Sequence, residues 1–96
     1  MSLPKNEKKD YFFKAILSLR DTEECYRFFE DVCTPDEVKE LARRMQTAKM
    51  LYHNHVYSAV AEETGLSVAT ISRVSRCLKY GSGGYYTVLE RLEKKK

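Results

Sequence analysis

The sequence lacks any apolar run long enough to cross a bilayer, for which a helix needs about 20 consecutive apolar residues. Its first residues, Met1 to Lys9, include lysines and a proline but no apolar stretch of the kind found in secretory signals. These two absences argue against membrane insertion and against export. We therefore expect a cytoplasmic protein with no membrane partner.

Cysteine is scarce and odd in number. Cys25, Cys33 and Cys77 cannot all pair within one chain, and no export signal precedes them. Thiols of cytosolic proteins are normally reduced, and free cysteines are among the residues most often buried. We therefore expect three buried thiols and no disulfide framework.

Recognisable catalytic signatures are also missing. The sequence has no glycine-rich phosphate loop, metal-binding motif or nucleophile signature, and Gly81-Ser82-Gly83-Gly84 is typical of a linker. His53 and His55, even with a cysteine brought near by folding, make a weak zinc motif. We therefore predict no enzymatic activity, no cofactor and no metal site.

The composition is that of a folded protein, with 43% apolar and 32% charged residues. A chain of 96 residues buries only about 60–65% of the surface that its unfolded form exposes. A core of that size is marginal when it stands alone. We therefore expect one domain, residues 1–96, which gains stability from a partner chain.

Apolar residues recur at helical spacing along the chain, and no segment of useful length alternates as a strand does. In the first helix Tyr11, Phe13 and Leu17 lie outside the main apolar stripe, so this helix has apolar residues on several faces. The sequence therefore predicts an all-α fold of about six helices, near residues 7–19, 22–32, 35–53, 57–64, 68–79 and 85–93.

The clearest helix start is Thr34-Pro35-Asp36-Glu37. It combines a capping threonine, a proline at the first helical position and a glutamate that can return a hydrogen bond to the cap. Asp21 and Glu24 have the same spacing, so a helix that ends near Val32 is expected to begin after Asp21. These caps fix two of the six helix boundaries.

The segment from Tyr57 to Tyr80 fits a helix-turn-helix. Such a motif needs a small residue in the first helix, a glycine at the turn and an apolar inner face on the second helix. Ala61 is the small residue of the first helix, with Val60 beside it, Gly65 is the glycine of the turn, and Leu66 closes the turn. The apolar inner face of the second helix consists of Ile71, Val74 and Leu78.

The outer face of the second helix favours contact with double-stranded DNA. Between Leu66 and Tyr80 every charged residue is basic, and short side chains near the helix start can enter a major groove. Ser67 is placed to cap this helix. The predicted DNA-binding residues are Ser67, Val68, Ala69, Thr70, Ser72, Arg73, Arg76 and Lys79.

Two other interpretations of this region stay open. The same helix pair is also suited to an interaction module that docks another transcription component. Tyr80, Tyr85 and Tyr86 could stack on single-stranded bases, although aromatic residues beside a helical stripe are more often core or dimer contacts. Strong salt dependence of binding to duplex DNA would favour a role in double-stranded DNA binding over both of these alternatives.

Several of these residues together resemble the tryptophan repressor family, and most closely its YerC/YecD branch. The resemblance covers about Tyr11 to Leu92, and six helices with a late helix-turn-helix match the family's order. The residues that carry it are Leu66-Ser67-Val68-Ala69-Thr70-Ile71-Ser72-Arg73, Ser75, Leu78-Lys79, Thr34-Pro35-Asp36-Glu37, Leu41 and Arg44.

The resemblance implies an intertwined homodimer that regulates transcription, most simply as a repressor. The helix-turn-helix at about 57–80 would contact DNA, and helices at about 7–53 and 85–93 would form the dimer. Two such motifs would contact successive major grooves about 34–36 Å apart at a pseudo-palindromic site.

The resemblance also implies a ligand pocket, in which Thr34, Arg44 and Arg73 would surround the family's bound amino acid. Val74 replaces a glycine that leaves room for the ligand in the family, and Cys77 replaces a pocket serine. Asp31 and Cys33 stand in place of apolar leucines. We therefore expect no response to tryptophan, an Arg44 that pairs with Glu37 or Glu40, and an effector, if there is one, of unidentified class.

Overall fold

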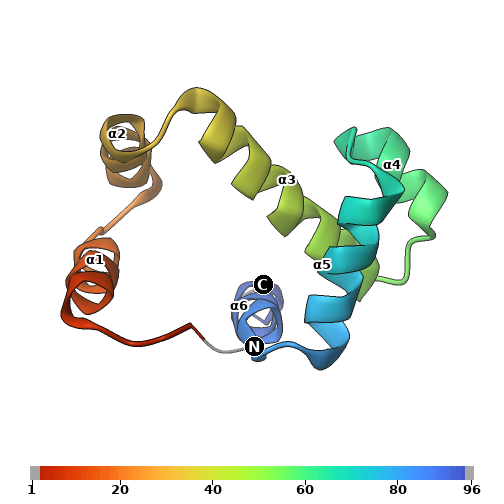
Figure 1. The fold of residues 1–96 in the computed structure, drawn as a ribbon. Helices are drawn as coiled ribbons and strands as arrows, with labels where there is room; N and C mark the ends of the chain where they lie inside the picture. The colour runs from red at the N-terminus through yellow and green to blue at the C-terminus, as the bar shows by residue number, and fades with distance from the viewer. Residues whose placement is uncertain (1–2, 95–96) are drawn as a thin grey trace. The chain divides into compact units, whose positions relative to one another are not determined.

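The computed structural model describes residues 3–94, and within this range it contains six helices and no strand. Figure 1 shows their order along the chain. Two compact units can be distinguished, residues 3–39 and residues 40–94, and helix α3 runs through the boundary between them. The helices are α1 (Glu7–Leu17), α2 (Thr22–Val32), α3 (Pro35–Tyr52), α4 (Tyr57–Thr64), α5 (Val68–Tyr80) and α6 (Gly84–Glu93).

Side-chain caps start the first three helices, as their sequence predicts for two of them. The Asp21 carboxylate accepts a hydrogen bond from the Glu24 backbone N–H at 2.8 Å, which caps α2. At the start of α3 the Thr34 hydroxyl accepts from the Glu37 N–H at 3.2 Å, and the Glu37 carboxylate accepts from the Thr34 N–H at 2.8 Å. This reciprocal pair confirms the predicted capping box. Helix α1 has a one-way cap, in which the Asn6 side chain accepts from the Lys9 N–H at 2.8 Å.

Helix α1 is shorter than its apolar pattern predicts. It ends at Leu17, and the Ser18 hydroxyl donates to the Ala15 carbonyl at 2.7 Å while the Ser18 N–H bonds to the last turn. This hydroxyl competes for the carbonyls that would continue the helix. Leu19 therefore lies outside α1, although its spacing fits the stripe.

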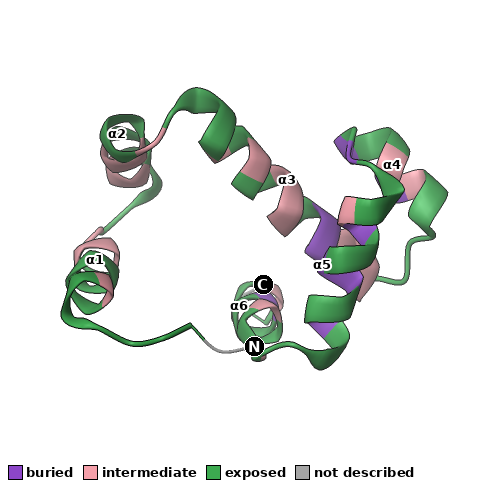
Figure 2. Cartoon of the chain, in the orientation of Figure 1, coloured by how far each residue is buried: buried purple, intermediate pink, exposed green. Residues whose placement is uncertain are grey.

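The unit of residues 3–39 has no buried residue in α1 or α2. Phe12 and Phe28 stack with ring centroids 6.2 Å apart, and Phe28 meets Phe29 edge to face at 5.3 Å. The Phe12–Phe28 contact links the two helices, whereas Phe28 and Phe29 both lie on α2. In Figure 2 both helices are coloured only as intermediate or exposed.

The unit of residues 40–94 contains the buried core, which α5 divides into two clusters. In the first, Val74 and Leu78 of α5 pack with Ala48 of α3 and Leu89 of α6. The second cluster lies on the α4 side of α5, and partly buried Leu51 packs against both clusters. Its buried members are Val60, Leu66 and Ile71.

Candidate nucleic-acid interface

The turn between α4 and α5 has the geometry of a helix-turn-helix. Gly65 adopts φ +75°, the left-handed conformation that glycine tolerates best, and its N–H bonds to the Ala61 carbonyl at 2.9 Å. Leu66 is buried next to it and closes the turn. The residues predicted to make the turn are therefore confirmed in that role.

Thr64 satisfies the buried polar groups of this turn, a role that the sequence did not suggest. Its hydroxyl donates to the Val60 carbonyl at 2.8 Å and accepts from the Leu66 N–H at 3.2 Å. An unpaired N–H in this buried position would cost about 1–3 kcal/mol. The position of Thr64 directly before Gly65 could have indicated this role, because a threonine hydroxyl can bond to nearby backbone groups.

Helix α5 separates an apolar inner face from a polar outer face. Ile71, Val74 and Leu78 are buried, as predicted from their spacing. Ser67 caps the helix, since its hydroxyl accepts from the Thr70 N–H at 3.2 Å. The inner face fixes the rotation of α5 about its axis, and thereby decides which residues face outward.

The outer face presents almost all of the predicted DNA-binding residues. Thr70 is the exception, because it is half-buried and its hydroxyl accepts from the Ser67 hydroxyl at 3.2 Å. Val68 at the helix start is 60% exposed. The remaining exposed members of the predicted set are Ser67, Ala69, Ser72, Arg73, Arg76 and Lys79.

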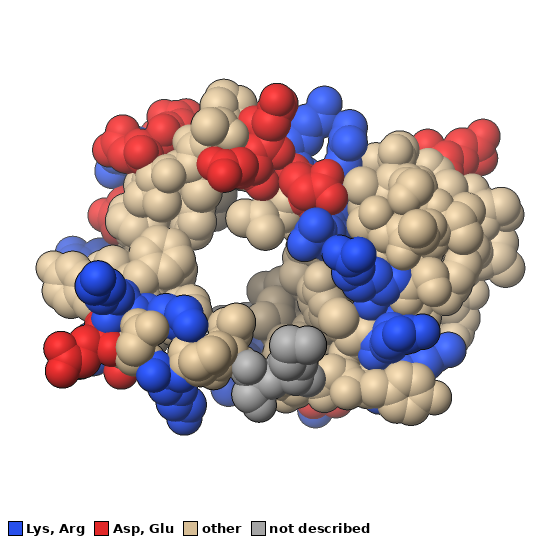
Figure 3. Space-filling view, in the orientation of Figure 1, with Lys and Arg blue, Asp and Glu red and all other residues tan. Residues whose placement is uncertain are grey.

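A shallow hollow of about 230 Å³ lies on this outer face. Its lining residues are Ala69, Ser72, Arg73 and Arg76, which follow one another along one side of α5. The two arginines and the serine offer donors for phosphate or base-edge acceptors. In Figure 3 Lys and Arg side chains gather over α5.

Three residues of the predicted ligand pocket, Thr34, Arg44 and Val74, are engaged in local contacts. The Thr34 hydroxyl caps α3, and the Arg44 guanidinium pairs with Glu40, with Nε and Oε2 3.4 Å apart. Glu40 is thus the partner of Arg44, while Glu37 serves the cap. Val74 fills core space between α3 and α6, and Arg73 is exposed.

Cys77 is exposed and neither of the other two cysteines is fully buried, so the expectation of three buried thiols is wrong. The buried stripe of α5 passes through Val74 and Leu78 and leaves Cys77 on its flank. Cys25 and Cys33 are half-buried. Burial raises the pKa of the nearby Tyr85 hydroxyl; the Cys77 thiol adds to the rise and Arg44 opposes it.

The two histidines make separate contacts. His53 Nε2 lies 3.2 Å from Glu93 Oε1, and His55 Nδ1 lies 3.0 Å from the Met50 carbonyl oxygen. Among residues 3–94 no three metal-ligating side chains gather around a common point.

Two of the tyrosines considered for base stacking differ in their surroundings. Tyr86 stacks edge to face on Tyr52 with ring centroids 5.7 Å apart, whereas Tyr80 is exposed.

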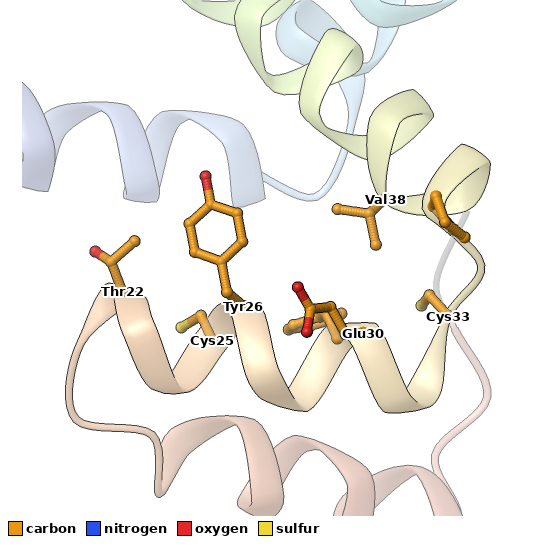
Figure 4. A pocket seen from close by; sticks show the side chains of 8 residues that line it. Thr22, Cys25, Tyr26, Glu30, Cys33 and Val38 are labelled. Atoms are coloured by element: carbon orange, nitrogen blue, oxygen red, sulfur yellow. The ribbon is translucent and has the colours of Figure 1, made fainter.

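A second surface feature lies within residues 3–39. An open apolar groove of about 710 Å³ runs along α2 to the first turns of α3. Figure 4 shows Thr22 and Tyr26 projecting from α2 to the same side, with Val38 contributed by α3. The other lining residues are Cys25, Phe29, Glu30, Cys33 and Pro35.

These features define the chain as an all-α protein with a helix-turn-helix, whose second helix carries an exposed basic face. No helix within residues 3–94 combines the length and apolar character needed to cross a membrane. The Trp repressor protein family matches residues 7–93. The chain belongs to this family and is of its YerC type.

The relatives agree with this assignment. The uncharacterized protein YerC of Bacillus subtilis strain 168 is 48% identical over 89 residues, which cover 93% of this chain and 86% of that protein. A TrpR-like protein from Eubacterium eligens ATCC 27750 is 52% identical, and its crystal structure superimposes with a TM-score of 0.90 over 93% of this chain and 92% of that one. The predicted family and fold class are thereby confirmed.

Proposed function

We propose that this chain is a transcriptional regulator, most simply a repressor, that binds specific sequences of double-stranded DNA as a homodimer in the cytoplasm. The observation that carries the proposal is the division of α5. Its inner face is buried, and its outer face carries three basic and no acidic side chains. Because the inner face is buried, the outer side chains stay on the side of the helix that would enter a major groove.

The outer residues suit different parts of the DNA. Val68 and Ala69, at the start of α5, fit contact with thymine methyl groups, and the Ser72 hydroxyl fits either a base edge or a phosphate. Arg73 and Arg76 fit phosphate or guanine, while Lys79 at the end of the helix fits phosphate. The Ser67 hydroxyl and the partly exposed Thr70 complete this proposed set.

The apolar surface of residues 3–39 supports the proposed dimer. Tyr11 and Leu17 of α1 are 78% and 83% exposed, and the α2 groove is lined mainly by apolar side chains. Exposed apolar area of this kind is characteristic of interaction surfaces. We propose that the helices at about 7–53 and 85–93 form the dimer and that residues 57–80 contact DNA.

The packing of Val74 supports a regulator that does not respond to tryptophan. Val74 packs against Ala48, Leu78 and Leu89 in the core, so its side chain occupies space that a ligand would need. Arg44 is held by Glu40. DNA binding would then need no corepressor, and calorimetric titration should detect no micromolar binding of tryptophan.

Salt-dependent binding to duplex DNA tests the central proposal. Affinity for a duplex selected from genomic fragments should fall steeply as salt rises, with a slope of log affinity against log salt equal to several charges. Replacing Arg73 and Arg76 together with alanine should abolish specific binding. Arg27→Ala is the matched control, because Arg27 lies on α2 and pairs with Glu23 at 3.5 Å.

Two outcomes would favour the interaction module instead. The first is the absence of binding to any duplex by the native chain. The second is duplex binding that neither salt nor the loss of Arg73 and Arg76 affects, because contacts to phosphate must release counterions.

A further inference from the structure

Arg43 of α3 brings a positive charge to the turn of the helix-turn-helix. Its Nη2 atom lies 3.9 Å from the position that a Cβ atom on Gly65 would occupy. Arg43 is far from Gly65 in the sequence, and it lies outside the segment that forms the motif. Only the packing of α3 against the helix pair places this guanidinium beside the turn.

The charge of Arg43 has no partner within residues 3–94. Its neighbour Arg44 pairs with Glu40 at 3.4 Å, but the ion pairs of this range do not include Arg43. Arg43 takes part in side-chain hydrogen bonding there only through its backbone carbonyl, which accepts from Thr47 Oγ1 at 2.9 Å. Arg43 as a whole is half-buried, and an arginine can pack its stem against apolar neighbours while its guanidinium stays in water.

We propose that Arg43 binds a phosphate of the DNA backbone beside the turn, an inference that rests on the proposed DNA-binding function. In helix-turn-helix complexes the first helix crosses the backbone, and the start of the second helix enters the groove. The turn joins these two parts and thus lies next to the strand that borders the groove. A guanidinium beside the turn would add to the contacts of α5 one that is independent of base sequence.

A purely structural role for Arg43 makes a different prediction. Helix α4 has no basic residue in its last turn, and the carbonyl end of a helix carries partial negative charge. Arg43 could therefore stabilise the end of α4 without touching DNA. In that case its removal would lower the melting temperature but would leave the salt dependence of DNA binding unchanged.

The experiment compares Arg43→Ala and Arg43→Lys in the full chain by fluorescence anisotropy. The probes are a duplex selected from genomic fragments and a scrambled duplex of the same composition. Arg43→Ala should weaken binding to both duplexes by about tenfold, since a charge-assisted hydrogen bond is lost. The salt slope should fall by about 0.9 for each phosphate contact removed, and Arg43→Lys should retain most of it.

Lys49→Ala is the matched control on the same helix. Lys49 lines a different hollow, together with Glu62 and Glu63, and the carboxylates of that hollow make it a poor site for a phosphate. Its loss should leave both affinity and salt slope unchanged. If Arg43→Ala fails to fold, Arg43→Gln keeps most of the stem and replaces it in the comparison.

The outcomes separate this inference from the function on which it rests. An unchanged salt slope in folded Arg43→Ala overturns the phosphate contact, even when affinity and melting temperature both fall. If the native chain binds no duplex, both proposals are wrong. If removing Arg73 and Arg76 abolishes binding but removing Arg43 has no effect, only the Arg43 contact is wrong.

Discussion

Residues 40–94 and residues 3–39 differ in how far their apolar side chains are buried. The first unit buries Val60, Ile71 and Leu89 almost completely within one chain. The second unit has helices of similar length and more aromatic residues, yet α1 and α2 bury none of theirs. Apolar content is therefore not what distinguishes the two units.

The difference lies in how many helices surround each apolar stripe. Helix α5 is packed by α3, α4 and α6, so its inner face is enclosed. Within residues 3–39, the aromatic contact between α1 and α2 is the Phe12–Phe28 pair, and the α2 groove stays open. Residues 40–94 thus hold the inner face of α5 in a buried core, while residues 3–39 offer a surface that a second chain could cover.

The largest expected effect tests the enclosed core. Ile71→Ala should lower the free energy of unfolding by about 2–5 kcal/mol, because Ile71 is 0% exposed and the change leaves a cavity. Val68→Ala on the exposed face of the same helix should cost less than about 0.5 kcal/mol. Urea denaturation measures both values, and equal losses would contradict the two-faced α5.

A somewhat smaller effect concerns the open surface. Tyr26→Asp should weaken the proposed dimer by about 2 kcal/mol or more, since Tyr26 lines the α2 groove and buried aromatic residues dominate interfaces. Sedimentation equilibrium measures the dimer affinity, with Arg27→Ala as the control on α2. A native chain that stays monomeric at high micromolar concentration would contradict the proposal that a second copy of the chain covers the α2 groove.

The turn within the enclosed unit should contribute less than its core. Gly65→Ala should cost about 1–2 kcal/mol, because φ +75° is strained for alanine although its Cβ would meet nothing closer than 3.9 Å. Gly84→Ala at the start of α6 has no neighbour within 4 Å and no positive φ, so it should be neutral or slightly stabilising. A Gly84→Ala loss equal to that of Gly65→Ala would show that backbone strain is not the cause.

The smallest expected effect is an alkaline loss of stability in the same unit. Because burial raises the pKa of Tyr85, the folded state favours its neutral form. The contribution is complete below the ordinary tyrosine pKa of about 10 and is lost as pH rises through the raised value. Tyr85→Phe should reduce this loss in pH-dependent thermal unfolding, whereas Tyr80→Phe, at an exposed site, should not.

The sequence predicted the helix-turn-helix well because its signals are local. Gly65 marks a backbone conformation, Ser67 marks a cap, and the spacing of Ile71, Val74 and Leu78 sets the inner face. The reciprocal cap between Thr34 and Glu37 was predicted for the same reason. Each of these depends on residues within one or two helical turns.

Predictions that depend on neighbouring elements were less complete. Cys77 was expected to be buried, but it is exposed beside the buried stripe of α5. Thr70 was expected on the outer face, but it is half-buried and its hydroxyl accepts a hydrogen bond from the Ser67 hydroxyl. Arg43 was missed entirely, because its place beside Gly65 follows from how α3 packs against the helix pair.

The sequence by itself determined the six helices, the motif and the resemblance to the Trp repressor family, since periodicity, caps and turn residues are properties of short segments. Only the tertiary structure decided which charged side chains form ion pairs and which apolar side chains are exposed to solvent. Among the described residues 3–94, Arg44 is paired while Arg43 is not, and Leu89 is enclosed while Tyr26 is exposed. These outcomes depend on which helices pack together, and pairing and burial need partners that lie far apart in the sequence.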